Sequence, residues 1–555
     1  MKELYEEITR TPRRSLDEFF SSSVRRHPDR PALVARGKSW SYIALDAECR
    51  AIERALRTAG LGRGGYNVGV VYAKGASSYA AVIAIMRTNN VYVPLNPKMP
   101  AERLLRMMDD AGIDVVIVDT DDTLSDGIVG ALVRSKPLTI LTNERHSNIL
   151  PDPMPEHARE HRHIVWRMPT STSPADETLG HLPDDGGTPT VAYIMYTSGS
   201  TGIPKGVAIT HESACSCIEK SHRLFETCEE DRFTQFSALS FDVSILDLFL
   251  CWKSGASLHV PAPSEALVPL SFVVSHGITV WSSVPSLSNF MLKLGLLKRN
   301  ALPRIRLSLF CGEALPSELA QAWATAAPRT RVINLYGPTE STIFATYHEY
   351  QSEGAATQAI VPIGKPLPGV RYLIVDEGRV IEQDDVPGEL WLSGDQLAGG
   401  YWNNPAATGA AFVQFPPADL PHENLWYRTG DLVSQRRDTG LSFRGRLDRQ
   451  VKLRGFRVEL QEIESAVRET VGCALVAVIP IRTTGGICEQ IIAYCDKLNA
   501  DESTIKDRCA ERIPRYMVPD RIIELDAFPL GSSGKIDYLA LAARATGGPA
   551  QVAGR

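Results

Sequence analysis

The segment YTSGSTGIPKG, residues 196–206, combines the residue types that hold polyphosphates. Its glycines let backbone N–H groups approach a ligand closely, its serines and threonines supply hydroxyls, and Lys205 adds a positive charge near its end. Such a loop can surround and neutralise phosphate oxygens. A Walker-type loop requires G-x-x-x-x-G-K-[ST], and that pattern fails because Lys205 follows Pro204 and precedes Gly206.

Four other charged residues lie in short motifs that could serve the same chemistry. Asp242 interrupts the apolar run SFDVSILDLFL (240–250), and Glu340 ends GPTE (337–340). Asp431 ends RTGD (428–431), and Lys535 lies in GSSGKID (531–537). Each has an ordinary alternative. The acidic residues could cap a helix or a turn, or their negative charge could stabilise a helix N-terminus. The lysine could simply be exposed to solvent. A buried Asp242 would be costly without a partner.

Two predicted strands flank the phosphate-type loop. TVAYIMY (190–196) is short, β-branched and aromatic and follows the turn-rich PDDGGTP, whereas GVAITH (206–211) is a second apolar run. A tight loop between two strands is a poor place for a flexible tether. The pattern therefore disfavours a Gly/Ser linker.

Composition limits the class of protein. With 555 residues the chain is too long for one compact core, so two or more domains are expected. The net charge is −6, and acidic and basic residues are interspersed, so the sequence shows no basic region typical of nucleic-acid binding. The first twenty residues are charged throughout, and no run of eighteen apolar residues occurs. The ten cysteines show no zinc spacing, which predicts free thiols in a reducing cytoplasm. The lack of a long apolar run predicts no membrane contact.

The order of predicted elements indicates an α/β fold. Residues 1 to about 140 alternate helical and strand-like patterns, as in a wound parallel sheet. Residues 143–189 are polar and rich in Pro and His, which predicts a long irregular surface excursion. Alternation resumes to about 350 and shorter strands follow. We expect a large domain of wound sheets and helices (1–447) and a small, mobile α+β domain (448–555), with a hinge near Asp448.

Taken in order, these motifs resemble the adenylate-forming superfamily, which includes acyl-CoA synthetases and luciferases. More narrowly, the chain resembles the amino-acid-activating adenylation domains of nonribosomal peptide synthesis. The resemblance covers nearly the whole chain. It rests on WSYIAL (40–45), VYVPLNPKMPAER (91–103), YTSGSTGIPKGV (196–207), FDVSILDLF (241–249), NLYGPTEST (334–342), GELWLSG (388–394), YRTGDL (427–432), GRLDRQVKLRGFRVE (445–459), YMVP (516–519) and GSSGKID (531–537).

The resemblance implies that a carboxylate attacks the α-phosphorus of ATP and releases pyrophosphate. Because both reactants are anionic, such catalysis relies on positioning and charge neutralisation. It assigns Glu340 to Mg²⁺, Tyr336 to stacking on adenine and Asn334 to the adenine amine. Asp431 would bind the ribose hydroxyls, and Arg446 the ribose or phosphate. The remaining implied ATP contacts are Thr197, Ser198, Gly199, Ser200, Thr201, Lys205, Gly337 and Thr339.

Lys535 takes the role of catalytic lysine by the same resemblance. It would bridge the substrate carboxylate and the phosphate oxygens. The local sequence departs from the family pattern, because Ser533 stands where Asn is usual and Gly531 where Thr is usual. The lysine itself is retained, so we keep the assignment.

Asp242 indicates the class of acid. In the family an Asp at this place pairs with the α-ammonium of an amino acid, a group that acyl- and aryl-activating relatives do not bind. The positions implied for the side-chain pocket carry no other charge, which favours a small or medium apolar α-amino acid. They are Val243, Leu246, Leu287, Leu309, Cys311, Leu335, Ile343 and Phe344.

The expected partner is a separate phosphopantetheinylated carrier protein, whose thiol would attack the aminoacyl adenylate. No carrier or condensation motif is visible, so a free-standing enzyme is expected. A small MbtH-like helper protein is a further candidate partner, which no motif identifies. Two alternatives are an acyl-CoA synthetase that uses coenzyme A and a catalytically inactive scaffold. Asp242 and the QVKLRGFRVE pattern (450–459) count against the first, and the intact set of charged residues counts against the second.

Overall fold

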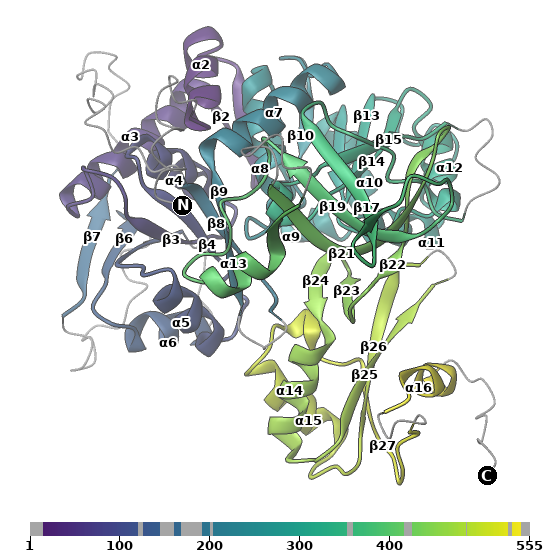
Figure 1. The fold of residues 1–555 in the computed structure, drawn as a ribbon. Coiled ribbons are helices and arrows are strands. Elements are labelled where there is room, and N and C mark those ends of the chain that lie inside the picture. Colours follow the sequence, from purple (N-terminus) through teal and green to yellow (C-terminus); the bar gives the residue numbers. More distant parts are fainter. Residues whose placement is uncertain are drawn as a thin grey trace, which may run out of the picture.

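The computed structural model describes residues 15–119, 126–144, 160–167, 191–199, 204–351, 359–415, 425–483, 486–530 and 536–545. A large body carries three sheets, and a smaller part built from the C-terminal residues lies below it in Figure 1. The predicted fold class, a large α/β domain followed by a small domain, is confirmed. Among the described residues, no helix is both long and apolar enough to cross a bilayer.

A seven-stranded sheet takes up most of the first 210 residues. Its strand order is β7-β6-β5-β3-β4-β8-β9, and every pairing is parallel except that of β8 with β9. The apolar, β-branched runs suit strands that are buried on both faces. The strands are β3 (Asn67–Val71), β4 (Val91–Leu95), β5 (Val115–Val118), β6 (Thr139–Asn143), β7 (Arg162–Trp166), β8 (Val191–Thr197) and β9 (Lys205–Thr210).

A nine-stranded sheet forms the second layer of the large domain, in the order β16-β15-β14-β13-β12-β10-β11-β1-β2. The six strands from β14 to β1 are parallel, and the edge strands are antiparallel. The strands are β1 (Pro31–Ala35), β2 (Lys38–Ser41), β10 (Arg232–Thr234), β11 (Ser257–Val260), β12 (Val280–Ser283), β13 (Leu307–Cys311), β14 (Arg331–Tyr336), β15 (Thr346–Glu349) and β16 (Lys365–Pro366).

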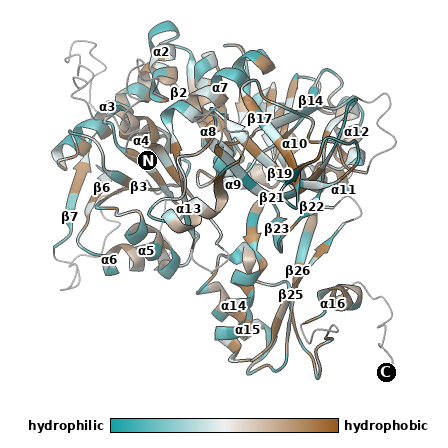
Figure 2. Cartoon of the chain, viewed as in Figure 1, coloured by the Kyte–Doolittle hydropathy of each residue, from teal (hydrophilic) through white to brown (hydrophobic). Residues whose placement is uncertain are grey.

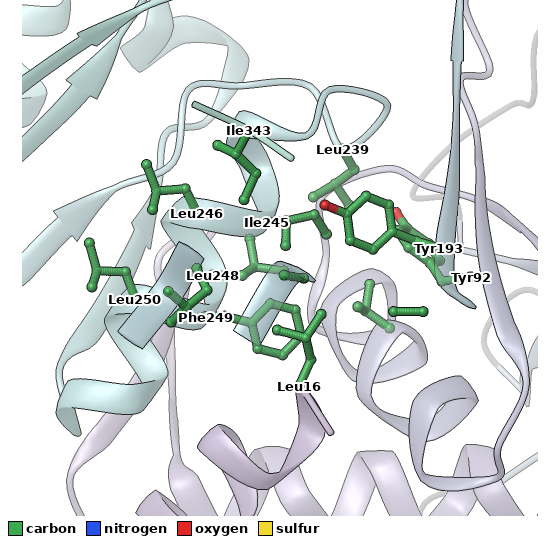
Figure 3. Close-up of a cluster of buried hydrophobic side chains, with 14 of the residues drawn as sticks. Leu16, Tyr92, Tyr193, Leu239, Ile245, Leu246, Leu248, Phe249, Leu250 and Ile343 are labelled. Atoms are coloured by element: carbon green, nitrogen blue, oxygen red, sulfur yellow. The ribbon is translucent and has the colours of Figure 1, made fainter. Parts of the chain in front are cut away.

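Helices cover these sheets and lie between them. They are α2 (Asp17–Arg26), α3 (Tyr42–Thr58), α4 (Ala76–Arg87), α5 (Ala101–Asp110), α6 (Asp126–Arg134), α7 (His211–Phe225), α8 (Val243–Ser254), α9 (Pro263–Ala266), α10 (Pro269–His276), α11 (Pro285–Lys293) and α12 (Ser317–Ala326). Helices α4 and α8 are apolar on nearly all sides and are therefore buried on nearly all sides. Figure 3 shows α8 residues, with Leu16, Tyr92, Tyr193 and Ile343, in one cluster of buried side chains.

The third sheet of the large domain is antiparallel. It has the order β18-β17-β19-β21-β20, with β22 also paired to β21. The elements are β17 (Val370–Asp376), β18 (Arg379–Val380), β19 (Gly388–Gly394), α13 (Pro405–Ala411), β20 (Phe412–Gln414), β21 (Leu425–Arg436) and β22 (Gly440–Arg446). The short strands predicted after residue 350 are thus present. Hydrophobic residues concentrate on the strands and polar ones on the outer helix faces (Figure 2).

The small part has its own sheet and core. Strands β24-β23-β26-β25 form a sheet, and β27 pairs with β26. One core cluster comprises only residues 451–522, which indicates an independent hydrophobic core. The elements are β23 (Gln450–Leu453), β24 (Phe456–Glu459), α14 (Leu460–Val471), β25 (Val476–Arg482), β26 (Cys488–Cys495), α15 (Glu502–Ala510), η6 (Arg515–Met517), β27 (Arg521–Glu524) and α16 (Tyr538–Ala545).

One part of the predicted surface excursion is wrong. Residues 162–166 form strand β7, which pairs in parallel with β6 at the edge of the seven-stranded sheet. Only Trp166 of this strand is buried, so its exposed and charged residues gave no strand-like pattern. Most of the remaining segment lies outside the described residues.

Candidate functional site

A cavity lies between the large domain and the hairpin of β23 and β24. Its volume is about 1000 Å³, including the part open to solvent. The large domain contributes residues from the ends of β8 and β13 and from the turn after β14. Carboxyl ends of parallel strands are the usual binding edge of α/β sheets. The small domain closes the cavity with Gln450, Lys452, Gly455, Arg457 and Tyr516.

Ten of the predicted site residues line this cavity together. They are Thr197, Ser198, Asp242, Val243, Cys311, Gly337, Thr339, Ile343, Asp431 and Arg446. Predicted residues that do not line it are Gly199, Lys205, Leu246, Leu287, Leu309, Asn334, Leu335, Tyr336, Glu340 and Phe344. Ser200, Thr201 and Lys535 lie outside the described residues.

Asp242 is a buried residue whose carboxyl is not fully hydrogen-bonded. Asp242 immediately precedes α8 in the chain, yet its side chain makes no capping hydrogen bond to that helix. Asp242 is 7% exposed, and its Oδ2 has no hydrogen-bond partner among the described residues. Burial raises the pKa of Asp242 to about 6, although the Thr339 hydroxyl and the Ile343 amide oppose that rise. Asp242 therefore does not cap helix α8, which was the alternative role for this residue.

A strained turn faces Asp242. Thr342 and Ile343 have φ of 58° and 72°, a backbone region that β-branched residues rarely adopt. The Phe344 N–H donates to the Thr342 carbonyl at 2.9 Å, which makes a three-residue turn centred on Ile343. Gln396 holds both ends, because its carbonyl accepts from Thr342 Oγ1 at 2.6 Å and its Nε2 donates to the Phe344 carbonyl at 2.9 Å. Such strain clusters at functional sites.

Strand register brings together the residues expected to bind ribose. Asp431 on β21 lies opposite Arg446 on β22. The Asp431 carboxylate accepts hydrogen bonds from the Tyr336 hydroxyl and from Arg446 Nη1. Arg446 also donates to both carboxylate oxygens of Asp448, at 2.6 and 2.7 Å, in the connection between β22 and β23. The expected ribose contact and the expected hinge thus share one arginine.

Asn334 is oriented by the backbone of a distant segment. Its Nδ2 donates to the carbonyls of Val361 and Pro362 at 3.2 and 2.9 Å. Because these two bonds use both amide hydrogens, Oδ1 is the atom that could accept from an amine. This is the role predicted for Asn334 towards adenine.

The phosphate-type loop starts and ends at a strand pair. Thr197 on β8 lies opposite Lys205 on β9, so the residues that flank the phosphate-type loop are adjacent in the sheet. The Lys205 ammonium lies over the Tyr401 ring at 5.4 Å from its centre. Ser198 Oγ donates to the main-chain carbonyl of Arg457 at 2.8 Å. The small domain therefore contacts this loop directly.

Glu340 lies in the short helix η4 (Thr339–Ser341) and is fully buried. Arg457 Nη1 donates to both of its oxygens, at 3.0 and 2.8 Å, and the Tyr401 hydroxyl donates to Oε1 at 2.8 Å. Burial alone would raise the pKa of Glu340, but the Arg457 charge and these hydrogen bonds hold it below the ordinary value. The predicted metal ligand is thus ionised and paired with the small domain.

The side chains of the predicted amino-acid pocket are apolar. Leu246, Leu309, Cys311, Leu335, Ile343 and Phe344 belong to the same buried cluster of the large domain. Leu287, on α11, is partly buried against a second cluster, and its place in the side-chain pocket stays a prediction. Its expected place rested on resemblance alone.

Several residues at the site were not predicted from the sequence. Arg457, Lys452 and Gln450 line the cavity from the hairpin of the small domain. Phe456 packs edge-on against Phe241 with ring centres 5.0 Å apart and stacks on Tyr516 at 3.7 Å. The motif GRLDRQVKLRGFRVE was noticed, but its spacing gave no sign of which side chains would face the large domain.

Two further contacts dock the small domain. Arg103 on α5 forms a buried ion pair with Glu462 on α14. Glu313 accepts from the Gly455 amide at 2.6 Å and from the Ser286 amide at 2.8 Å. A Cβ on Gly455 would lie 2.6 Å from Val284 Cγ1, so the close approach of the hairpin requires glycine.

Comparison with known proteins agrees with this arrangement. The AMP-binding enzyme family model matches residues 20–402, and the model of the AMP-binding enzyme C-terminal domain matches residues 462–535. Bacitracin synthase 1 of Bacillus licheniformis is 31% identical over 535 residues, which are 95% of this chain and 9% of that protein. Chondramide synthase cmdD of Chondromyces crocatus is 31% identical over 536 residues, which are 94% of this chain and 13% of that protein. The chain thus spans only a small part of the length of these relatives.

Two solved structures are similar over most of their length. The adenylation domain AlmE of Vibrio cholerae, in complex with glycyl-adenosine-5′-phosphate, superposes with a TM-score of 0.85 at 28% identity. The match covers 97% of this chain and 99% of AlmE. PA1221, an NRPS protein containing adenylation and PCP domains, superposes with a TM-score of 0.74 at 25% identity, covering 96% of this chain and 97% of that one. The chain belongs to the AMP-binding enzyme family.

Proposed function

We propose that this enzyme activates a small or medium apolar α-amino acid with ATP. The amino acid carboxylate attacks the α-phosphorus, an aminoacyl adenylate forms and pyrophosphate leaves. The aminoacyl group then passes to the phosphopantetheine thiol of a separate carrier protein. The observation that carries the proposal is the buried Asp242 carboxyl in the cavity, whose Oδ2 has no hydrogen-bond partner among the described residues.

The α-ammonium group of an amino acid could form an ion pair with the Asp242 carboxylate. A carboxylate buried without a partner is costly, and a cation within hydrogen-bond reach removes most of that cost. The pKa of Asp242, about 6, would fall when an ammonium binds beside it, so the ionised form would dominate at neutral pH. A fatty or aryl acid would bring no such cation and would leave Oδ2 of Asp242 without a partner.

The remaining assignments follow the resemblance. Asp431 is proposed to bind the ribose, Asn334 and Tyr336 the adenine, and Thr197, Ser198 and Lys205 the phosphates, together with Ser200 and Thr201. The orientation of Asn334 Oδ1 and the strand register at Asp431 support these roles. Lys535 is proposed as the catalytic lysine that stabilises charge on the attacked phosphate.

Mg²⁺ is proposed to bind Glu340. Mg²⁺ is commonly held by one or two carboxylates together with substrate phosphates. Glu340 fits that pattern, because it is a single ionised carboxylate next to Thr339, which lines the cavity together with Thr197 and Ser198 of the phosphate-type loop. Within the described residues, no group of three or more His, Cys, Asp or Glu side chains could hold a metal without a substrate. The metal would supply charge neutralisation at the phosphates.

The apolar pocket supports the substrate class. Leu246, Leu309, Leu335 and Ile343 are buried and uncharged, so a charged amino acid side chain would lack a partner there. The glycyl adenylate bound by AlmE agrees with a small substrate. An apolar pocket separates substrates by only about 1–3 kcal/mol per methylene, so neighbouring aliphatic amino acids should also be accepted.

The carrier partner and the hinge rest on further likeness. PA1221 contains PCP domains beside its adenylation domain, which supports transfer to a carrier. Asp448 is proposed as the pivot, because it lies in the short connection between β22 of the large domain and β23 of the small one. An MbtH-like helper remains a candidate partner, and co-expression with one is its test.

Amino-acid-dependent ATP–pyrophosphate exchange over a broad panel tests the proposal. We expect exchange with aliphatic α-amino acids and little with acidic, basic or des-amino acids. Exchange driven equally by fatty or aryl acids would favour the acyl-CoA synthetase alternative. Absence of exchange with every acid, in protein that binds ATP, would favour the inactive scaffold.

A further inference from the structure

We infer that Arg457 and the divalent cation compete for Glu340, so that docking of the small domain as observed excludes the metal. The inference rests on the proposed role of Glu340 and adds a role for Arg457, which neither the motifs nor the relatives assign. Its basis is the contact between a buried carboxylate of the large domain and a guanidinium that arrives on β24 of the small domain.

Both oxygens of Glu340 are engaged in this orientation. Oε2 accepts from Arg457 at 2.8 Å, while Oε1 accepts from Arg457 at 3.0 Å and from Tyr401 at 2.8 Å. A divalent cation bound to either oxygen would lie within a few ångströms of a positive guanidinium in a buried site. Like charges repel strongly at that distance because little water screens them. The Glu340 carboxylate can therefore bind either Arg457 or the divalent cation, but not both at once.

Arg457 also occupies the phosphate side of the site. Its main-chain carbonyl accepts from Ser198 Oγ at 2.8 Å, so one residue contacts both the phosphate-type loop and the proposed metal ligand. The triphosphate and its metal would need those same groups. The observed orientation thus suits the stage after pyrophosphate and metal have left, when Glu340 would otherwise remain buried and uncompensated.

The exchange of cations is coupled to domain orientation because Arg457 belongs to a rigid hairpin. Strands β23 and β24 pair over four residue pairs, and Phe456 of the same hairpin packs against Phe241. Arg103 with Glu462, and Glu313 with the Gly455 amide, hold the hairpin in the same position. Withdrawal of Arg457 therefore requires movement of the small domain. Loading of the metal would favour one orientation, and its departure would favour the other.

The test measures metal affinity rather than turnover. Full-length enzyme, saturated with α,β-methylene-ATP and without amino acid, is titrated with Mn²⁺, and free Mn²⁺ is followed by electron paramagnetic resonance. Arg457→Gln should bind Mn²⁺ about tenfold more tightly, if the docked state holds about 90% of the wild-type molecules. Arg457→Lys retains a positive charge and should stay near the wild-type affinity.

Lys293→Gln is the matched control. Lys293 pairs with Glu489 across the same two domains, and both side chains are exposed at the surface. It should leave Mn²⁺ affinity unchanged. Equal tightening in Lys293→Gln and Arg457→Gln would overturn the inference, because loosened docking alone would then explain it. Unchanged affinity in Arg457→Gln would overturn it as well. Failure of every variant and of wild type to bind nucleotide with Mn²⁺ would instead reject the proposed ATP site, and the inference with it.

Discussion

Two buried carboxylates in one site behave differently. Glu340 is fully buried, has both oxygens bonded and has a pKa below its ordinary value. Asp242 is almost as buried, has an oxygen without a partner and has a pKa of about 6. Glu340 receives its cation from the small domain, whereas no cation of the described chain pairs with Asp242. The difference suggests that Asp242 is reserved for a charge on the substrate.

The largest effect should come from removing the reserved carboxylate. Asp242→Ala would leave the substrate α-ammonium buried without a partner, and breaking such a pair costs about 3–5 kcal/mol. Amino-acid-dependent pyrophosphate exchange should therefore fall by roughly three orders of magnitude. The temperature of thermal unfolding should be unchanged or higher, because the variant loses a buried carboxyl oxygen that has no hydrogen-bond partner. A loss of activity accompanied by unfolding would not support the pairing.

Removing Lys535, the cation proposed to act at the substrate carboxylate, should reduce activity somewhat less. Lys535→Ala should slow adenylation by ~10²–10³-fold, the loss typical of one preorganised electrostatic contact. Thioester formation from supplied aminoacyl adenylate should suffer far less, because Lys535 acts on the first half-reaction. Equal losses in both half-reactions, in folded protein, would contradict the assignment.

The pH profile should separate the two carboxylates. Asp242 must be ionised to bind an ammonium, and its pKa in the empty site is about 6. The value of kcat/KM for the amino acid should therefore be full above that pH and fall as pH drops through about 6, by about tenfold per unit well below it. The pKa of Glu340 lies below its ordinary value, so it stays ionised across this range. An inflection near 6 that persists in Asp242→Ala would assign it to another group.

A change at the hinge should leave the first half-reaction largely intact. Asp448→Pro fixes the backbone φ and should impair carrier loading while sparing pyrophosphate exchange. Asp448→Ala is the matched control, because it removes the pairing with Arg446 but leaves the backbone free. A similar loss of exchange and loading in the proline variant would place the pivot elsewhere.

Local sequence patterns predicted the elements that depend on local chemistry. The strands around 196–206 and the α/β alternation follow from apolar runs and turn residues, and the structure has both. Asp242 could be suspected from an acid in an apolar run. The pairing of Glu340 with Arg457 could not, because 117 residues separate them and the contact depends on how two domains are oriented. Leu287 was placed in the pocket by resemblance alone, and its packing against a second hydrophobic cluster leaves that assignment a prediction.

The most direct test of the central claim compares one amino acid with its des-amino counterpart. Pyrophosphate exchange is measured for both acids with wild type and with Asp242→Ala. If Asp242 binds the α-ammonium, wild type should turn over the amino acid far faster than the des-amino acid, and the variant should largely lose that preference. If wild type turns over the des-amino acid equally well, the α-amino assignment is contradicted and an acyl-activating enzyme becomes the better account.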